Sequence, residues 1–234
     1  MPKTSVLIAT RDRPVYLAEA IASIETQTDV DWELIVCDNA STDPQVGRVI
    51  GEAQDRIGER FRTERVDLGD RPAACWNHAL RSARGHYCTI LDDDNRKRPD
   101  FLTKMIAPLD ADRTASATTC GWHKFGAGWD EDVHENLRTS YEALRMDNTV
   151  DGNALLYRRV MVLDRLGGYD ESLTTSEDWH FVIRLVQSFR VVNLPDVLVD
   201  YRMHEGMRTY RAPALGRDAN IRRIRAELYP AEVA

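Results

Sequence analysis

The sequence predicts an α/β fold, in which a mainly parallel central sheet carries helices on both faces. One observation is that four short apolar runs alternate with amphipathic segments, the runs lying at 5–10, 32–37, 61–66 and 87–91. A second is that polar residues follow the first, second and fourth runs directly, as at the carboxyl edge of an open α/β sheet. A third is the composition of the 234 residues, 43% hydrophobic and 29% charged, which suits a globular protein with a substantial core.

Three helices are predicted between these strands, at 14–27, 44–57 and 72–84. Each begins with a proline, whose fixed φ and missing N–H suit the first helical position. Gly58 and Gly85 end the last two helices.

The C-terminal half is predicted to contain helices at 100–109, 158–166 and 176–186, and strands at 114–120, 191–195 and 197–202. Ser176 is the expected N-cap of the third of these helices. The segment 121–148 carries aromatic residues suited either to stacking on a sugar or to ordinary packing, and its acidic part, 130–146, is predicted as weakly helical. A basic helix at 217–228 is expected to be a solvated terminal helix, although a surface for a partner or lipid is the alternative.

Charge and hydropathy exclude several classes of protein. The net charge of −7, with both signs mixed, argues against nucleic-acid binding. No apolar run approaches the roughly 20 residues of a transmembrane helix, and the N-terminus lacks a signal-peptide core. We therefore expect a cytoplasmic protein, with action at a membrane surface left open. The four cysteines lack metal-site spacing and are expected to be buried and reduced.

The acidic triplet Asp92-Asp93-Asp94 follows the fourth apolar run at once. Adjacent carboxylates repel one another unless a cation compensates them. A hard divalent cation that bridges to substrate phosphates would do so, whereas a solvated acidic turn is the simpler alternative. The glycine-rich signatures of dinucleotide-binding proteins and P-loop NTPases are absent, which favours phosphate binding through a metal at the triplet.

A second pair of carboxylates, Glu177 and Asp178, opens the helix at 176–186. Carboxylates in a first helical turn are stabilised by the helix dipole, and this is the structural explanation of the pair.

The joint order and spacing of these motifs resemble family 2 glycosyltransferases of the GT-A fold, which use nucleotide-diphosphate sugars. The resemblance covers roughly positions 4–206 and rests on stretches at 5–13, 32–43, 74–80, 83–87, 91–94, 167–171, 176–179 and 201–204. It implies a Rossmann-like, mostly parallel sheet with a smaller acceptor-side subregion. It also implies one domain at 1–206, with a nucleotide-binding half at 1–95 and an acceptor-binding half at 96–206, followed by a tail at 207–234.

The resemblance implies roles for individual residues. Asp178 is the expected catalytic base, with Glu177 the less favoured candidate. Asp92, Asp94 and His204 are expected to hold Mn²⁺ or Mg²⁺, the triplet matching the family's DXD motif. The nucleotide sugar is expected to contact Thr10, Arg11, Asp12, Arg13, Asp38, Arg71, Asn77, Asp92 and Asp93.

The expected activity is the transfer of one sugar, with inversion, from a nucleotide-diphosphate sugar to an acceptor hydroxyl on a saccharide, a lipid-linked intermediate or a small natural product. UDP is the favoured nucleotide, although Arg11-Asp12-Arg13 stands where many relatives have Tyr-Asn, which leaves base selectivity open. The lack of a Q-x-x-R-W motif disfavours a polymer synthase. A nucleotidyltransferase and a non-catalytic sugar- or nucleotide-binding module are the alternatives, and homodimer formation is left open.

Overall fold

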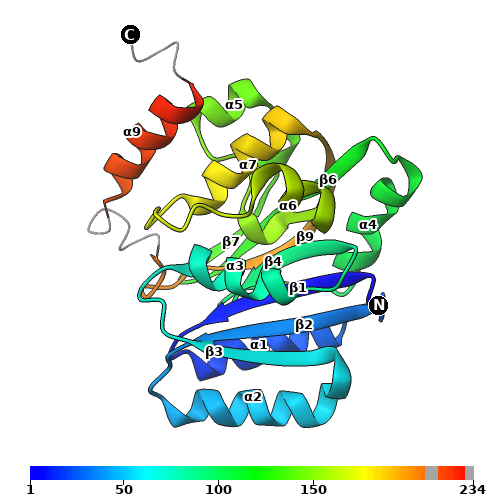
Figure 1. Ribbon diagram of the computed structural model, residues 1–234, viewed down its shortest axis with the longest axis vertical. Helices are drawn as coiled ribbons and strands as arrows, with labels where there is room; N and C mark the ends of the chain where they lie inside the picture. The colour runs from blue at the N-terminus through cyan, green and yellow to red at the C-terminus, as the bar shows by residue number, and fades with distance from the viewer. Residues whose placement is uncertain (209–215, 230–234) are drawn as a thin grey trace.

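The computed structural model describes residues 1–208 and 216–229, which form a nine-stranded sheet with helices on both faces (Figure 1). The strand order is β3-β2-β1-β4-β8-β6-β9-β5, and β7 pairs with β6. The N-terminal strands β1 (Thr4–Thr10), β2 (Trp32–Asn39), β3 (Phe61–Val66) and β4 (Tyr87–Asp92) are all parallel. The α/β prediction is therefore confirmed, and its parallel part is this half.

Alternation along the buried strands divides the core into two layers. Val6 and Ile8 of β1 pack with α1 (Pro14–Glu25), α2 (Pro44–Ile57) and α4 (Phe101–Ala111). Leu7 packs on the other face, with α3 (Pro72–Ser82), α6 (Arg159–Leu166) and α7 (Glu177–Ser188). Neighbouring residues of a strand point to opposite faces, so a strand covered on both sides must be apolar throughout.

The C-terminal half of the sheet is mixed. Strand β8 (Leu155–Arg158) is antiparallel to β4 and to β6 (Ala115–Gly126), whereas β6 is parallel to β9 (Arg190–Arg202). The short β5 (Arg96–Lys97) pairs with β9. The parallel part of the sheet therefore ends at β4, and the next strand in the sheet, β8, runs in the opposite direction.

Two predictions for this half are wrong. The strands expected at 191–195 and 197–202 are one continuous strand, β9, because irregular register against β6 accommodates Pro195. The expected helical part of 130–146 starts instead as β7 (Trp129–Val133), which forms a hairpin with β6. Only Glu135–Arg138 and α5 (Tyr141–Met146) are helical there.

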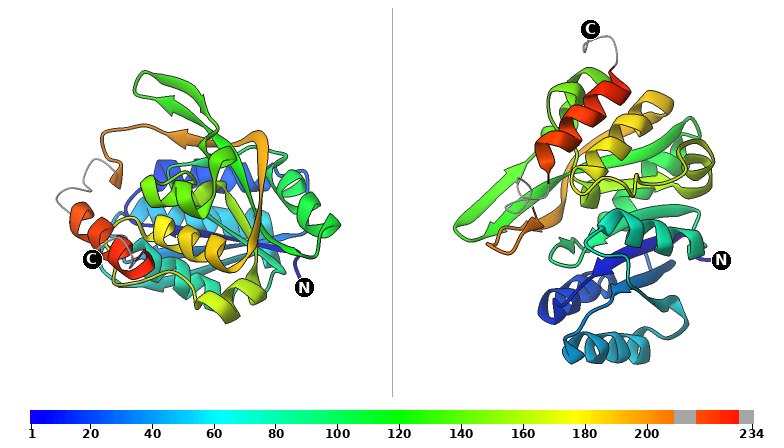
Figure 2. Two further views of the ribbon diagram at one scale, coloured as in Figure 1. Left: turned by 90° about the horizontal axis from the view of Figure 1, so that it is seen from above. Right: turned by 60° about the vertical axis from the view of Figure 1, so that its left-hand side comes forward.

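The last described helix, α9 (Arg217–Leu228), lies beside α7 in every view (Figures 1 and 2). Ile224 is fully buried in the contact. The predicted helix is therefore confirmed and most of its residues are exposed, but Ile224 docks one side of it on the fold. Across residues 1–208 and 216–229, none of the helices has the length and apolar character needed to span a bilayer.

Candidate active site

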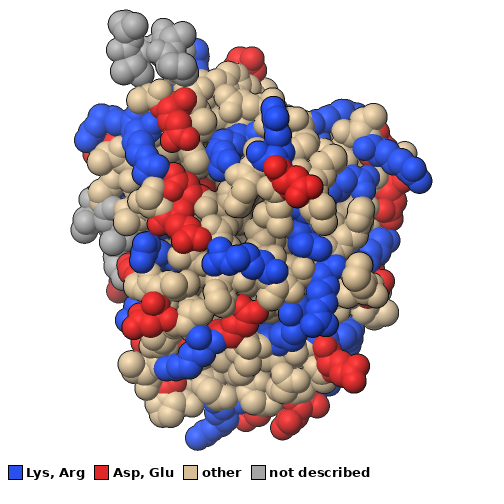
Figure 3. Space-filling view, in the orientation of Figure 1, with Lys and Arg blue, Asp and Glu red and all other residues tan. Residues whose placement is uncertain are grey.

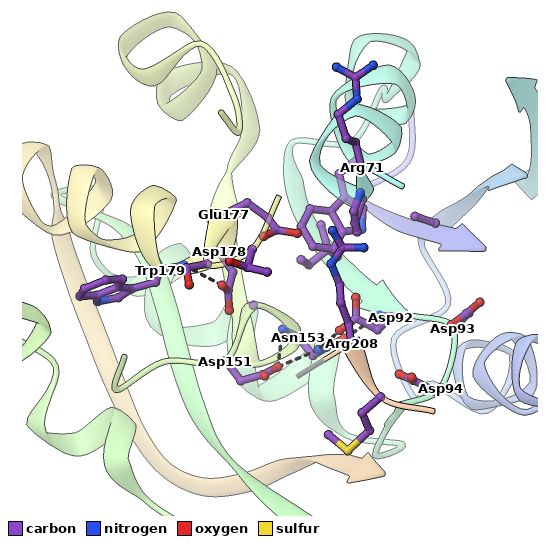
Figure 4. Close-up of a pocket in the computed structure, with 18 of the residues that line it drawn as sticks. Arg71, Asp92, Asp93, Asp94, Asp151, Asn153, Glu177, Asp178, Trp179 and Arg208 are labelled. Atoms are coloured by element: carbon purple, nitrogen blue, oxygen red, sulfur yellow. Dashed lines mark hydrogen bonds between the residues drawn. The ribbon is translucent and has the colours of Figure 1, made fainter. Parts of the chain in front are cut away.

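A cavity of about 720 Å³ opens at the carboxyl ends of β1 and β4 (Figure 4). Its wall includes the loop after β1, the acidic triplet, the turn before α3, the turn η3 (Gly152–Ala154), the first turn of α7 and one side of α9. In Figure 4, Glu177 and Asp178 lie on one side of this cavity and the acidic triplet on the other. The fold therefore brings to one cavity two sets of carboxylates, the triplet and the pair, that lie more than 80 positions apart in the sequence.

Arg13 lies against the acidic triplet and compensates part of its charge. Its guanidinium donates to Asp93 Oδ1 at 3.1 Å and to Asp94 Oδ2 at 2.7 Å. Thr10 Oγ1 donates to the other oxygen of Asp93 at 2.8 Å. Burial raises the pKa of Asp93 to about 6, against the lowering effect of Arg13. Asp93 and Asp94 therefore share the Arg13 guanidinium as a partner within the fold.

Asp94 also faces His204, whose Nε2 lies 3.1 Å from Asp94 Oδ2. Asp92 is not part of this contact. Within the described part of the chain, Asp92, Asp94 and His204 do not bring three ligand atoms within 4.8 Å of one another. The structure thus brings together two of the three predicted metal ligands and holds the third apart.

Asp92 is instead bound to Asn153, a residue that the sequence reasoning missed. The Asp92 backbone N–H donates to Asn153 Oδ1 at 2.6 Å, and Asn153 Nδ2 donates to Asp92 Oδ2 at 2.8 Å. Asn153 Nδ2 also donates to Asp151 Oδ1 at 2.7 Å. Asp151 and Asn153 both line the cavity. In the sequence, the turn-forming run Asp151-Gly152-Asn153 is the feature that could have indicated Asn153.

The buried side chain of Lys97 stabilises the η3 turn through a hydrogen bond. Lys97 Nζ donates to the Asn153 carbonyl at 2.6 Å and to Thr89 Oγ1 at 3.0 Å, and it lies over the Phe101 ring. Burial lowers the pKa of Lys97 to about 7. A Cβ atom on Gly152 would meet Ile90 Cδ1 at 2.9 Å and Asp178 Cβ at 3.2 Å. The turn is therefore packed closely between β4 and the start of α7.

The start of α7 departs from a simple capped helix. Ser176 is the N-cap residue of α7, as predicted, but its φ is 63° and its side chain makes no capping hydrogen bond. This left-handed conformation is strained for a residue other than glycine, and such strain concentrates at functional sites. Asp178 Oδ1 accepts from the Trp179 N–H at 2.8 Å, and Oδ2 accepts from Asn148 Nδ2 at 3.3 Å.

The pKa values of both acids of this turn are raised. Burial is the main cause that raises the pKa of Asp178. Burial, together with the Asp178 charge, raises the pKa of Glu177 to about 7. Carboxyl groups of raised pKa in a cleft are candidates for acid–base chemistry.

Several residues predicted for nucleotide binding reach the cavity. They are Thr10, Arg11, Asp12, Arg13, Arg71, Asp92 and Asp93. Asp12 has φ of 54°, and its Oδ1 accepts from the backbone N–H groups of Thr42 and Asp43, which lowers its pKa. Asp12 therefore also shapes the loop that follows β2.

Asp38 and Asn77 do not line the cavity. Asp38 is buried, is paired with Arg65 and accepts from the Ser41 N–H. Asn77 exchanges hydrogen bonds with the backbone N–H and carbonyl of Tyr169. Asn39, the neighbour of Asp38, lines the cavity instead. The aromatic residues Phe125 and Trp129 contact the cations of Arg96, Arg202 and Lys124, and Trp122 is buried.

The curled α/β sheet, with an acidic strand end facing a carboxylate pair, defines the class of GT-A glycosyltransferases. The profile described as "Glycosyl transferase family 2" matches residues 5–164, and one described as "Glycosyltransferase like family 2" matches residues 124–220. The chain therefore belongs to glycosyl transferase family 2.

Two curated proteins are similar to parts of this chain. The protein y4gI of Sinorhizobium fredii is 28% identical over 211 residues, which cover 82% of this chain and 21% of that protein. The GalNAc(5)-diNAcBac-PP-undecaprenol beta-1,3-glucosyltransferase of Campylobacter jejuni is 38% identical over 108 residues, covering 45% of this chain and 34% of the relative. The chain thus spans only a part of these relatives.

Solved structures share the fold. TarS 1–349 of S. aureus in complex with UDP superposes with a TM-score of 0.72 at 18% identity, covering 86% of this chain and 60% of that one. The mannosyltransferase PcManGT of Pyrobaculum calidifontis, in complex with GDP-Man and Mn²⁺, gives a TM-score of 0.67 at 23% identity and covers 91% and 61% of the two chains.

Proposed function

We propose that this chain transfers one sugar, with inversion at the anomeric carbon, from a nucleotide-diphosphate sugar to an acceptor hydroxyl, with the aid of a divalent cation. The observation that carries the proposal is the position of Asp178. Its carboxylate lines the same cavity as the acidic triplet and lies on the opposite side (Figure 4). A base and a leaving-group site that face each other across one cavity suit a single displacement.

In the proposed reaction, Asp178 accepts the proton of the acceptor hydroxyl as the oxygen attacks the anomeric carbon. The bond from that carbon to the diphosphate breaks, and the nucleoside diphosphate leaves with the bonding electrons. Because attack and departure occur on opposite faces of the sugar, the configuration inverts. Asn148 orients Asp178 through the hydrogen bond to its Oδ2 atom.

The residues present suit a cation such as Mn²⁺ or Mg²⁺ at Asp94 and His204. Asp94 Oδ2 lies 3.1 Å from His204 Nε2, so an oxygen ligand and a nitrogen ligand are already adjacent. Carboxylate and imidazole ligands suit Mn²⁺. The bound ion would stabilise the charge that develops on the leaving diphosphate. Asp92, held by Asn153, is positioned to contact the sugar nucleotide.

UDP is the nucleotide that we propose for the donor. A structural neighbour carries UDP, and another of the TarS structures contains UDP-GlcNAc. Arg11 and Arg71 are exposed, line the cavity and are available to the nucleotide. The mannosyltransferase neighbour carries GDP-Man, so GDP is the competing nucleotide to test.

The test measures binding and turnover with both nucleotides. We expect UDP with Mn²⁺ to raise the melting temperature more than GDP with Mn²⁺, and EDTA to abolish this difference. Incubation with UDP-sugars and an acceptor panel should release UDP, and NMR of the product should show an inverted anomeric centre. Retained configuration, or equal turnover in EDTA, would contradict the inverting or the metal-dependent part of the proposal.

A further inference from the structure

Helix α9 is fastened to the segment that leads into the proposed base. Asn220 Nδ2 donates at 3.0 Å to the hydroxyl groups of both Thr174 and Thr175. Arg223 donates to Ser172 Oγ at 2.7 Å and pairs with Asp170. One face of α9 therefore rests on the turn directly before Glu177 and Asp178.

A neighbouring stripe of α9 faces the cavity. It consists of Arg217, Ile221 and Arg225, which line the cavity wall. Residues four apart lie on one side of a helix, and eight residues extend about 12 Å along its axis. Figure 3 shows basic side chains over this helix, mixed with acidic ones. The stripe presents two cations, separated by an apolar side chain, to the part of the cavity next to α7.

The two arginines of the stripe have no carboxylate partner in the described part of the chain. Arg217 makes no polar contact there, and Arg225 donates only to the Met146 carbonyl, at 3.4 Å. Of the other arginines of the cavity wall, Arg13 is paired with the triplet, Arg202 with Glu19 and Arg208 with Asp70, whereas Arg11 and Arg71 have no carboxylate partner among the described residues. Charge pairing with the residues that the structure describes therefore does not account for Arg217 and Arg225.

Binding of the donor's diphosphate does not account for Arg217 and Arg225 either. The proposed diphosphate position is at the triplet, on the opposite side of the cavity from α7 (Figure 4), and Arg11 directly follows β1, the strand that pairs with β4. Helix α9 contacts α7, which carries the proposed base. A ligand that places its hydroxyl at Asp178 would extend along the stripe.

We propose that Arg217 and Arg225 bind anionic groups, phosphate or carboxylate, on the acceptor, with Ile221 contacting its apolar part. This inference rests on the proposed glycosyl transfer and names the chemical class of its acceptor. Guanidinium groups form paired, charge-assisted hydrogen bonds with phosphate and carboxylate. The net charge of −7 would otherwise repel such an acceptor, so local positive charge is required.

The test uses four probes on the full chain saturated with UDP and Mn²⁺. Farnesyl-diphosphate-linked N-acetylglucosamine is compared with farnesyl N-acetylglucosaminide, and tetragalacturonate with cellotetraose, by isothermal titration. We expect at least one anionic probe to bind about tenfold or more tightly than its neutral counterpart. The two pairs distinguish phosphate from carboxylate. The Arg217→Gln/Arg225→Gln double variant should lose this preference and keep its affinity for UDP.

Arg222→Gln is the matched control, because Arg222 is exposed on the same helix and does not line the cavity. It should keep the anionic preference. Equal binding of charged and neutral probes by the wild type, or a preference that survives in the double variant, would overturn the inference. Failure to turn over any UDP-sugar would instead count against the proposed function, so the two failures are distinct.

A membrane surface is the competing role for the stripe. Sedimentation with vesicles of phosphatidylcholine and phosphatidylglycerol addresses it directly. Vesicle binding lost in the double variant, with unchanged affinity for the soluble tetragalacturonate and for the diphosphate probe, would overturn the acceptor assignment. Unchanged vesicle binding together with weaker probe binding supports it.

Discussion

Asn153 and Asp92 exchange two hydrogen bonds, of 2.6 and 2.8 Å, so that a side chain of the C-terminal half fixes both the backbone and the carboxylate at the end of β4. Asn153 precedes β8, the strand that pairs antiparallel with β4. The reversal of strand direction at β4 is therefore what brings the η3 turn to the acidic triplet.

Replacing Asn153 with alanine should release Asp92 and leave its N–H unsatisfied. A buried donor without a partner costs about 1–3 kcal/mol. We expect a lower melting temperature and a rise in KM for the donor of about tenfold. Asn193→Ala is the control, because Asn193 bonds to Thr119 and does not line the cavity. An unchanged donor KM in Asn153→Ala, measured beside that control, would remove the positioning role.

Lys97→Met tests the support beneath the same turn. The variant removes both hydrogen bonds of Nζ, including the one to the Asn153 carbonyl. We expect kcat/KM for the donor to fall by roughly tenfold, about 1.4 kcal/mol of transition-state stabilisation. Lys104→Met, which removes an exposed surface cation of α4, should leave kcat/KM unchanged. Equal values for the two variants would show that Lys97 has no influence on the site.

The same variant should change how stability depends on pH. The folded-state pKa of Lys97 is lowered to about 7, so the unfolded chain binds a proton that the folded chain does not between about pH 7 and 10.5. The free energy of unfolding of the wild type should therefore increase with pH across this window because of Lys97. In Lys97→Met this increase should be absent. Urea unfolding at pH 7 and pH 9.5 measures the difference.

Glu177→Gln should show the opposite dependence. Because the folded pKa of Glu177 is raised to about 7 from 4.5, ionisation opposes folding as pH rises between these values. The variant should be more stable than the wild type at pH 8, by about 1–3 kcal/mol, and equal to it near pH 4. Thermal unfolding at both pH values tests this. A gain that persists at pH 4 would show a cause other than ionisation.

The parts of the fold that the sequence predicted are those with strong local signals. Prolines at the first position of α1, α2 and α3 and the apolar run of β1 led to correct elements. Local signals failed at β9, where Pro195 suggested a break. Pairing with β6 on one side outweighed that local preference, because an irregular register absorbs the proline.

The candidate site shows the same contrast between features that local sequence patterns predict and features that depend on tertiary contacts. Acidic residues at strand and helix ends form visible patterns, and the five predicted from them, Asp92, Asp93, Asp94, Glu177 and Asp178, all line the cavity. Asn153, Lys97 and the stripe on α9 were missed, because their importance comes from contacts across the sheet reversal and from the docking of α9. Asp38 and Asn77 matched motif positions, but their side chains are used within the fold.

The most direct test of the central claim is kcat for sugar transfer by Asp178→Asn, with UDP affinity measured alongside. We expect kcat to fall by about 10²–10⁴, the usual contribution of a positioned general base, while the Kd for UDP with Mn²⁺ stays within about twofold. Asp147→Asn removes an exposed carboxylate from the wall of the same cavity and should keep full activity. A kcat for Asp178→Asn equal to that of Asp147→Asn would contradict the assignment of Asp178 as the base.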